Sequence, residues 1–160
     1  MEIRRIGADG FDLIWPILEP EFRAGLTYAV DPGITREDAC RYWIATARET
    51  HVAVEGDVVL GTYCIRTNQP GFGDHICNCG YIVAEAARGR GLAARMCQHS
   101  QERARALGYA AMQFNFVLES NRGAVALWQR MGFGIVGTIP GAYRHPVEGL
   151  VAAHVMLKAL

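Results

Sequence analysis

The stretch Arg88-Gly89-Arg90-Gly91-Leu92-Ala93 decides the fold that we predict for this chain. It follows the apolar, strand-like segment Gly80-Tyr81-Ile82-Val83 and begins a long amphipathic helix. A strand, a glycine turn and a helix start direct several unpaired backbone N–H groups to one point, where the positive end of the helix dipole also lies. Because two arginines flank the glycines, the stretch predicts a site for a phosphate or pyrophosphate. A tight turn without a ligand is the alternative interpretation of Gly89 and Gly91.

Two common nucleotide-binding motifs fit this stretch poorly. The Walker motif requires Gly-Lys-Ser/Thr, and the chain contains no Gly-Lys pair. The dinucleotide motif Gly-x-Gly-x-x-Gly tolerates alanine at its last position, where Ala94 stands, but it belongs to the first strand–helix unit of a larger fold. Here the glycines lie mid-chain, so neither nucleotide-binding fold is expected.

Two motifs resemble those of the GCN5-related N-acetyltransferase (GNAT) family. Arg88-x-x-Gly91-x-Ala93 is similar to the family's Gln/Arg-x-x-Gly-x-Gly/Ala motif, which binds the pyrophosphate of acetyl-CoA. Val83 precedes Arg88 by five residues, as in the family's fourth strand. Downstream, the family's Asn-x-x-Ala-x-x-Leu-Tyr-x-x-x-Gly-Phe motif is matched by Asn121-x-x-Ala124-x-x-Leu127-Trp128-x-x-x-Gly132-Phe133. The motifs cover about residues 80–135, and the other predicted elements extend the resemblance over most of the chain.

The resemblance implies an α/β fold, a mixed and mostly antiparallel sheet of about seven strands with about four helices, splayed between strands four and five. It implies one domain over residues 1–160 that transfers an acetyl group from acetyl-CoA to an amine, without a metal. The backbone of Ile82 is expected to donate to the oxyanion, and Val83 to pair with the pantetheine arm. The further residues that the resemblance assigns to acetyl-CoA are Arg88, Gly89, Arg90, Gly91, Leu92, Ala93, Asn121, Ala124 and Trp128.

Length and composition agree with a single α/β enzyme domain. A chain of 160 residues buries about two-thirds of its unfolded surface. Lys+Arg and Asp+Glu number 16 each, so we expect no nucleic-acid partner and no anionic membrane surface as partner. No apolar run approaches the ~18 residues of a membrane helix, and no signal peptide opens the chain. Cys77-x-Cys79 lacks a second ligand pair, so the chain's five cysteines are expected as reduced thiols in a cytoplasmic protein.

The predicted elements mix strands and helices. We expect strands over Glu2–Ile6, His51–Val54, Val58–Arg66, a stretch ending at Val83, Tyr109–Leu118, Gly134–Ile139 and Leu150–Leu157. The hairpin between the second and third of these is predicted at Glu55-Gly56-Asp57. We expect helices from an Asp9 cap toward Gly25 with interruptions at Pro16 and Pro20, from Arg36 to about Arg48 after the capping-box-like Thr35-x-x-Asp38, from Gly91 to Gly108, and from Asn121 to Gly132.

Trp128 departs from the family motif, which has a tyrosine that is thought to protonate the leaving thiolate. Indole has no hydroxyl and cannot serve as that acid, although a thiol of pKa about 8.5 leaves as its anion near neutral pH. Trp128 is expected either to shape the acyl pocket or to fill the core. Tyr143 is a substitute acid only if the strand after Gly141 brings it close.

The sequence signals for the residues that bind the acceptor amine are less specific than the cofactor motifs. Gln113, Asn115 and Glu119 have the same parity on the predicted fifth strand, so they are expected on one face. We predict that Asn115 binds substrate, against a purely structural hydrogen bond for a buried amide. Glu119 is a candidate base acting through a water, against a solvated carboxylate. His75 and His145, both expected in loops, are further candidate bases.

The family resemblance extends to the substrate. Tyr28, Arg23 and the Trp15–Glu19 region belong to the helices that wall the acceptor site in this family, and Arg144 or Arg23 is a candidate for holding a substrate carboxylate. The segment Gly137–His145, together with Gln113-Phe114-Asn115, resembles the branch that acetylates free amino acids and toxic analogues.

Three functions follow from these motifs. The leading prediction is a cytoplasmic, acetyl-CoA-dependent N-acetyltransferase acting on a small amine, a free amino acid or an analogue. The second is an enzyme that acetylates a protein N-terminus or a lysine. The third is a CoA-binding module without turnover, which the exchange at Trp128 suggests. A symmetric homodimer is common in the family.

Overall fold

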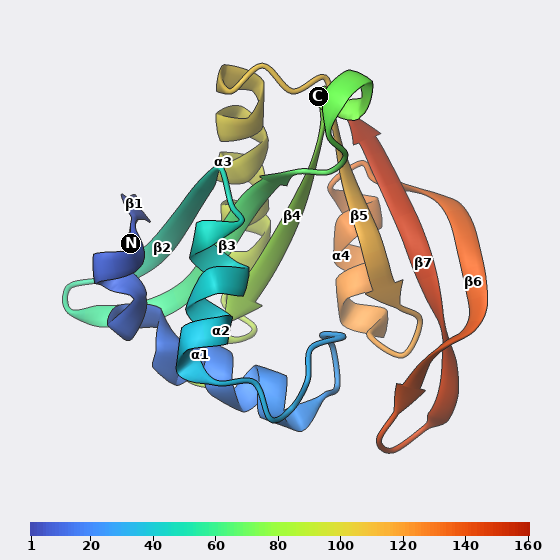
Figure 1. The fold of residues 1–160 in the computed structure, drawn as a ribbon, viewed down its shortest axis with the longest axis horizontal. Coiled ribbons are helices and arrows are strands. Elements are labelled where there is room, and N and C mark those ends of the chain that lie inside the picture. The colour runs from blue at the N-terminus through green and yellow to red at the C-terminus, as the bar shows by residue number, and fades with distance from the viewer.

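A seven-stranded sheet forms the centre of the computed structural model, which describes residues 1–160 (Figure 1). The order across the sheet is β1-β2-β3-β4-β5-β7-β6, and every neighbouring pair is antiparallel except β4 and β5. The predicted mixed, mostly antiparallel sheet is confirmed. The strands are β1 (Glu2–Ile6), β2 (Glu49–Glu55), β3 (Val58–Thr67), β4 (Ile76–Val83), β5 (Ala111–Leu118), β6 (Gly134–His145) and β7 (Gly149–Ala159).

The two parallel strands separate soon after they begin. Only three residues of β4 pair with β5, and the last of these pairs is Asn78 with Gln113. A register irregularity in β5 between Phe114 and Val117 accompanies the separation. In Figure 1 the two strands start side by side near the top and diverge toward the bottom. The part of β4 after Asn78 therefore has no ladder partner on its β5 side, as the predicted splay requires.

Helices cover both faces of the sheet: α1 (Phe11–Ala24), α2 (Arg36–Cys40), α3 (Leu92–Ala106) and α4 (Arg122–Arg130). Buried side chains of α1, such as Phe22, pack with Trp43 and Ile82 on one face. Buried side chains of α3 and α4, such as Met96 and Trp128, pack on the other. No helix in the structure has the length and apolar character needed to cross a membrane.

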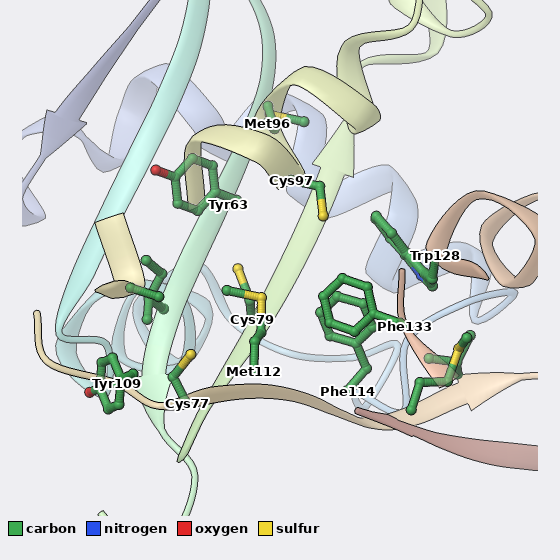
Figure 2. Packing of buried hydrophobic residues seen from close by; sticks show 14 of the residues in the cluster. Tyr63, Cys77, Cys79, Met96, Cys97, Tyr109, Met112, Phe114, Trp128 and Phe133 are labelled. Atoms are coloured by element: carbon green, nitrogen blue, oxygen red, sulfur yellow. The ribbon is translucent and has the colours of Figure 1, made fainter. Parts of the chain in front are cut away.

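An aromatic cluster anchors α4 beside the splay (Figure 2). The rings of Phe114 and Phe133 stack with centroids 4.2 Å apart, and the ring of Trp128 lies 5.0 Å from that of Phe114. Such pairs contribute about 0.5–1.5 kcal/mol each beyond the area that they bury. The β5 edge of the splay and α4 are therefore held together as one unit.

The first helix corrects two expectations. α1 runs through Pro16 and Pro20 without a break. Both prolines lie on its exposed face, where water satisfies the carbonyls that lose an N–H partner, while the buried face holds the helix on the sheet. Asp9 is not the cap either, because it lies in a 3-10 turn and the cap residue is Gly10, without a side-chain bond.

The second helix begins as predicted and ends early. Thr35 Oγ1 accepts a hydrogen bond from the Asp38 amide at 3.1 Å, so the cap is confirmed. The α-helix stops at Cys40, however, and a π-helical turn, Arg41–Ala45, replaces the expected helix toward Arg48. This turn directs Trp43 into the core, since its indole N–H donates to Thr62 at 3.2 Å.

The last hairpin is longer than expected. β6 does not end at Ile139 but continues past Pro140 and Gly141 to His145. Proline is tolerated there because β6 is an edge strand with a register irregularity in this segment. His145 is thus a buried strand-end residue rather than a loop histidine, and its Nδ1 accepts the amide of Glu148 at 3.1 Å.

Candidate active site

A cavity of about 550 Å³ lies at the splay. Residues from α1, the loop after it, β3, β4, β5 and α4 line it together. It brings together eight of the predicted site residues: Tyr28, Ile82, Val83, Arg88, Asn115, Asn121, Ala124 and Trp128. Glu119 and Tyr143 are not among its lining residues.

The glycine turn lies beyond β4, at the start of α3. Gly89 and Gly91 have φ values of 76° and 73°, and a Cβ at either position would meet no atom within 4 Å. The Arg95 amide donates to the Gly91 carbonyl at 3.2 Å, so the amides that precede Arg95 in α3 have no intrahelical acceptor. An open turn with unpaired amides at a helix N-terminus fits a pyrophosphate.

The two arginines of the motif bind carboxylates. The Arg88 guanidinium pairs with Glu21 of α1, and that of Arg90 pairs with Glu55 at 3.1 Å. Arginine–carboxylate pairs as exposed as these contribute about 0–1 kcal/mol. Either guanidinium can therefore turn toward a phosphate at little cost, and their role in binding acetyl-CoA stays a prediction.

Hydrogen bonds between β3 and β4 determine which β4 amides face the gap. The Ala84 amide donates to the Leu60 carbonyl at 2.9 Å. Hydrogen-bonded pairs alternate along an antiparallel ladder, so Ile82, which pairs with Thr62, also directs its amide toward β3. The prediction that Ile82 is the oxyanion donor is therefore wrong, because the strand register turns that amide away from the gap.

The amides of Tyr81 and Val83 face the gap instead. The hydroxyl of Tyr28 bridges the backbone of Tyr81, donating to its carbonyl and accepting from its amide at 2.8 Å each. Burial holds the pKa of Tyr28 well above its ordinary value, so the phenol stays protonated. Val83 has no partner in β5 and is the gap-facing amide beside the glycine motif.

Gly80 makes the Tyr28 bridge sterically possible. A Cβ at Gly80 would lie 3.2 Å from the Tyr28 hydroxyl oxygen and 3.3 Å from a ring carbon of Trp43. Sequence reasoning did not single out this glycine, although a glycine inside an apolar strand is a signal of close approach.

Side-chain amides form a chain beside the point where β4 and β5 separate. The Asn115 amide N–H donates to Asn68 Oδ1 at 2.7 Å, and Gln113 donates to Asn115 Oδ1 at 2.8 Å. Gln113 and Asn115 thus share a face, as predicted, but the Asn115 side chain is exposed rather than buried. Glu119 is exposed beyond the register irregularity of β5.

Tyr143 lies near Tyr28 with its hydroxyl already bonded. It donates to the carbonyl of Gly25 at 2.8 Å and lies 3.3 Å from that of Tyr28, so it ties the end of α1 to β6. Of the arginines proposed for a substrate carboxylate, Arg23 pairs with Glu19 at 3.2 Å, and neither it nor the exposed Arg144 lines the cavity.

His75 and His145, the two candidate bases, also lie outside the cavity lining. His75 is exposed in the turn before β4.

Trp128 combines the two roles that the sequence left open. Its indole is 8% exposed and packs against the ring of Tyr81 with centroids 5.0 Å apart. It also lines the cavity. The residue that replaces the family's tyrosine therefore is part of the core and forms a wall of the site.

Comparisons with known proteins place this fold among acetyltransferases. The sequence model of the acetyltransferase (GNAT) family matches residues 11–133. The chain belongs to the GNAT family. It is 39% identical to a GCN5-related N-acetyltransferase from Kribbella flavida, with a TM-score of 0.92 over 99% of this chain and 97% of that chain.

Two further relatives are more distant. The chain is 28% identical over 152 residues to the N-acetyltransferase aca1 of Schizosaccharomyces pombe, covering 84% of this chain and 73% of that protein. It is 19% identical to a phosphinothricin acetyltransferase from Sinorhizobium meliloti in complex with acetyl-CoA, with a TM-score of 0.86 over 99% and 88% of the two chains. This GNAT protein is an acetyl-CoA-dependent N-acetyltransferase, and no group of three or more His, Cys, Asp or Glu side chains in its structure is arranged to hold a metal.

Proposed function

We propose that this enzyme acetylates the amine of a small molecule, a free amino acid or a close analogue. The size of the cavity carries this proposal. About 550 Å³ is within the range of small-molecule sites, and the end of the pantetheine arm must share that volume with the acceptor. The space left suits an acceptor of amino-acid size. The likeness to a phosphinothricin acetyltransferase, at 19% identity, concerns the fold and does not choose the acceptor.

The chain's own groups supply positioning and polarisation. Acetyl-CoA, when bound, supplies an activated thioester carbonyl. In our proposal Val83 pairs with the pantetheine arm, and the gap-facing amide of Tyr81, once Tyr28 moves, donates to the carbonyl oxygen. Holding two reactants in the reactive geometry lowers a barrier by about 7–11 kcal/mol, so little further catalysis is needed.

The proton of the amine leaves to water in this proposal. Glu21 is the one carboxylate that lines the cavity, and it pairs with Arg88. No histidine lines the cavity, so neither a histidine nor an unpaired carboxylate is available there as a general base. Glu119, at the end of β5, is retained as a base that acts through a water molecule. Trp128 shields the thioester from solvent, and the thiolate leaves unaided.

Free-thiol release from acetyl-CoA tests the proposal. Purified protein is assayed against amino acids, their analogues, polyamines and short peptides at matched concentrations. We expect turnover with free amino acids or analogues. Turnover with peptides alone would favour the protein-acetylating alternative, and CoA-dependent thermal stabilisation without turnover on any acceptor would favour the non-catalytic module.

We also propose that the protein is a homodimer. The edge strand β6 exposes three large apolar side chains, Ile135 (40%), Val136 (61%) and Ile139 (49%). Such an edge is a template for pairing with a second strand. Sedimentation equilibrium would give twice the chain mass, and Val136→Lys would shift it toward the monomer.

The five free cysteines support our placement of the enzyme in the cytoplasm.

A further inference from the structure

The cavity contains one cationic side chain that no carboxylate compensates. Two arginines line it, Arg66 and Arg88. The Arg88 guanidinium binds Glu21, the one carboxylate in the lining, whereas Arg66 forms no salt bridge with any residue of the chain. The cavity therefore carries a net positive charge at the position of Arg66.

Arg66 lies at the end of the cavity that is far from the glycine turn, where we place the acceptor. It pairs across the sheet with Asn78 of β4, and Asn78 pairs with Gln113 of β5, so the three residues form one row. That row is the last one before the two strands separate. Tyr81 lies three residues further along β4, about 10 Å away at the rise of a strand. Arg88 follows still later, toward the glycine turn, so the two arginines mark opposite ends of the cavity.

The Arg66 guanidinium is held in place by its neighbours. It lies over the ring of Tyr42 at 4.6 Å, its Nε donates to Thr46 Oγ1 at 3.0 Å, and its Nη2 donates to the Tyr42 carbonyl. The guanidinium has five N–H groups, and these two hydrogen bonds, together with one to the Cys64 thiol, leave others without a protein acceptor. An oriented guanidinium with free N–H groups loses little side-chain entropy when it binds an anion.

We propose that Arg66 binds a carboxylate of the acceptor, so that the substrate is a small molecule bearing both an amine and an acid group. This inference rests on the proposed function and adds to it the residue that recognises the acid group. Fifteen of the 23 residues that line the cavity are hydrophobic, so an acid group there is partly removed from water. In such surroundings a charge-assisted bond from arginine is stronger than at the surface. Asn115 of β5 also lines the cavity and offers an exposed side-chain amide as a second polar group.

A pair of acceptors that differ only at the acid group, compared at a pH at which both amines are largely unprotonated, tests the inference. Each amino acid that is acetylated is compared with its own carboxamide, which keeps the amine and loses the anion. We expect a kcat/KM at least 10-fold higher for the acid than for the amide in the wild-type enzyme. We expect Arg66→Gln to raise the KM for the acid roughly 10- to 100-fold, to leave the KM for acetyl-CoA unchanged, and to abolish the preference for acid over amide.

Two variants separate charge recognition from a structural role. Arg66 also supports Tyr42 and Thr46, so Arg66→Gln can lose stability; Arg66→Lys keeps the charge and is expected to keep part of the preference. Arg41→Gln is the matched control, because Arg41 is exposed, pairs with Asp38 and lies outside the cavity. It should leave both KM values unchanged.

The outcomes distinguish this inference from the proposed function. Equal kcat/KM for acid and amide in the wild-type enzyme, or an equal loss for both in Arg66→Gln, would overturn the role of Arg66 while small amines remained substrates. Acetylation of peptides without any activity on small amines would overturn the proposed function and this inference with it. If Arg66→Gln does not fold, the wild-type comparison and Arg66→Lys still decide.

Discussion

Replacement of Gly91 by glutamate should abolish CoA binding and leave the fold intact. Gly91 caps α3 with φ of 73°, and a Cβ there would meet no atom within 4 Å. The folding cost is therefore the backbone cost of a left-handed residue, about 1–2 kcal/mol. For a chain of this length, that cost lowers the Tm by about 2–8 °C.

The loss of CoA affinity should be much larger. The glutamate side chain enters the space beside the unpaired α3 amides, where we place the pyrophosphate. A carboxylate about 5 Å from a doubly charged pyrophosphate is repelled by about 2–3 kcal/mol at an effective dielectric constant of about 40–80. Repulsion alone then weakens binding roughly 30- to 150-fold, and steric exclusion adds to it.

Gly108 offers a matched control on the same helix. It follows the C-terminal end of α3 with φ of 91°, and a Cβ there would also meet nothing within 4 Å. The 15 residues of α3 separate it from Gly91 by about 22 Å. Gly108→Glu should destabilise the fold by a similar amount and bind CoA normally in calorimetry. Gly91→Glu with an affinity within threefold of wild type, or equal losses in both variants, would refute the assignment of the glycine turn to the pyrophosphate.

Three further predictions concern the acceptor, the end of α1 and His51, a buried histidine of β2. Asn115→Ala should raise the acceptor KM with an unchanged KM for acetyl-CoA. Normal kinetics with reduced stability would show that Asn115 has only a structural role. Tyr143→Phe removes the bond to the Gly25 carbonyl and should lower the stability by about 1 kcal/mol with kcat within twofold; a drop in kcat of tenfold or more, with a normal Tm, would show that the phenol is the acid. Burial lowers the pKa of His51 to about 4, below its unfolded value of about 6.5, so the unfolded chain takes up the proton first as the pH falls. Stability should drop by about 2 kcal/mol from pH 7 to pH 5, and urea unfolding of His51→Gln should show a smaller drop.

Local chemistry made several features predictable. The Arg88–Ala93 stretch indicated an anion site because a glycine turn before a helix exposes amides whatever the rest of the fold does. Thr35 capped the second helix because the cap bond joins residues three apart. The sheet class and the family followed from motifs of this kind, and the comparisons confirm both.

Other expectations failed where tertiary packing decided. Pro16 and Pro20 did not break α1, because its buried face keeps the helix on the sheet. The place of Ile82 in a motif predicts it as the oxyanion donor. The direction of its amide depends on the pairing with Thr62, which lies 20 residues away in sequence. A local motif contains no information about that pairing.

Some features of the site likewise follow from local sequence, and others depend on tertiary contacts. The cofactor motif, the family and the enzyme class were predictable from the sequence, since these depend on residues that are close along the chain. Tertiary packing alone brings the Tyr28 hydroxyl onto the backbone of Tyr81 beside Gly80, and places Arg66 in the cavity lining without a carboxylate partner. Such contacts join segments far apart in sequence, and their existence depends on strand register and on the path of the chain after α1.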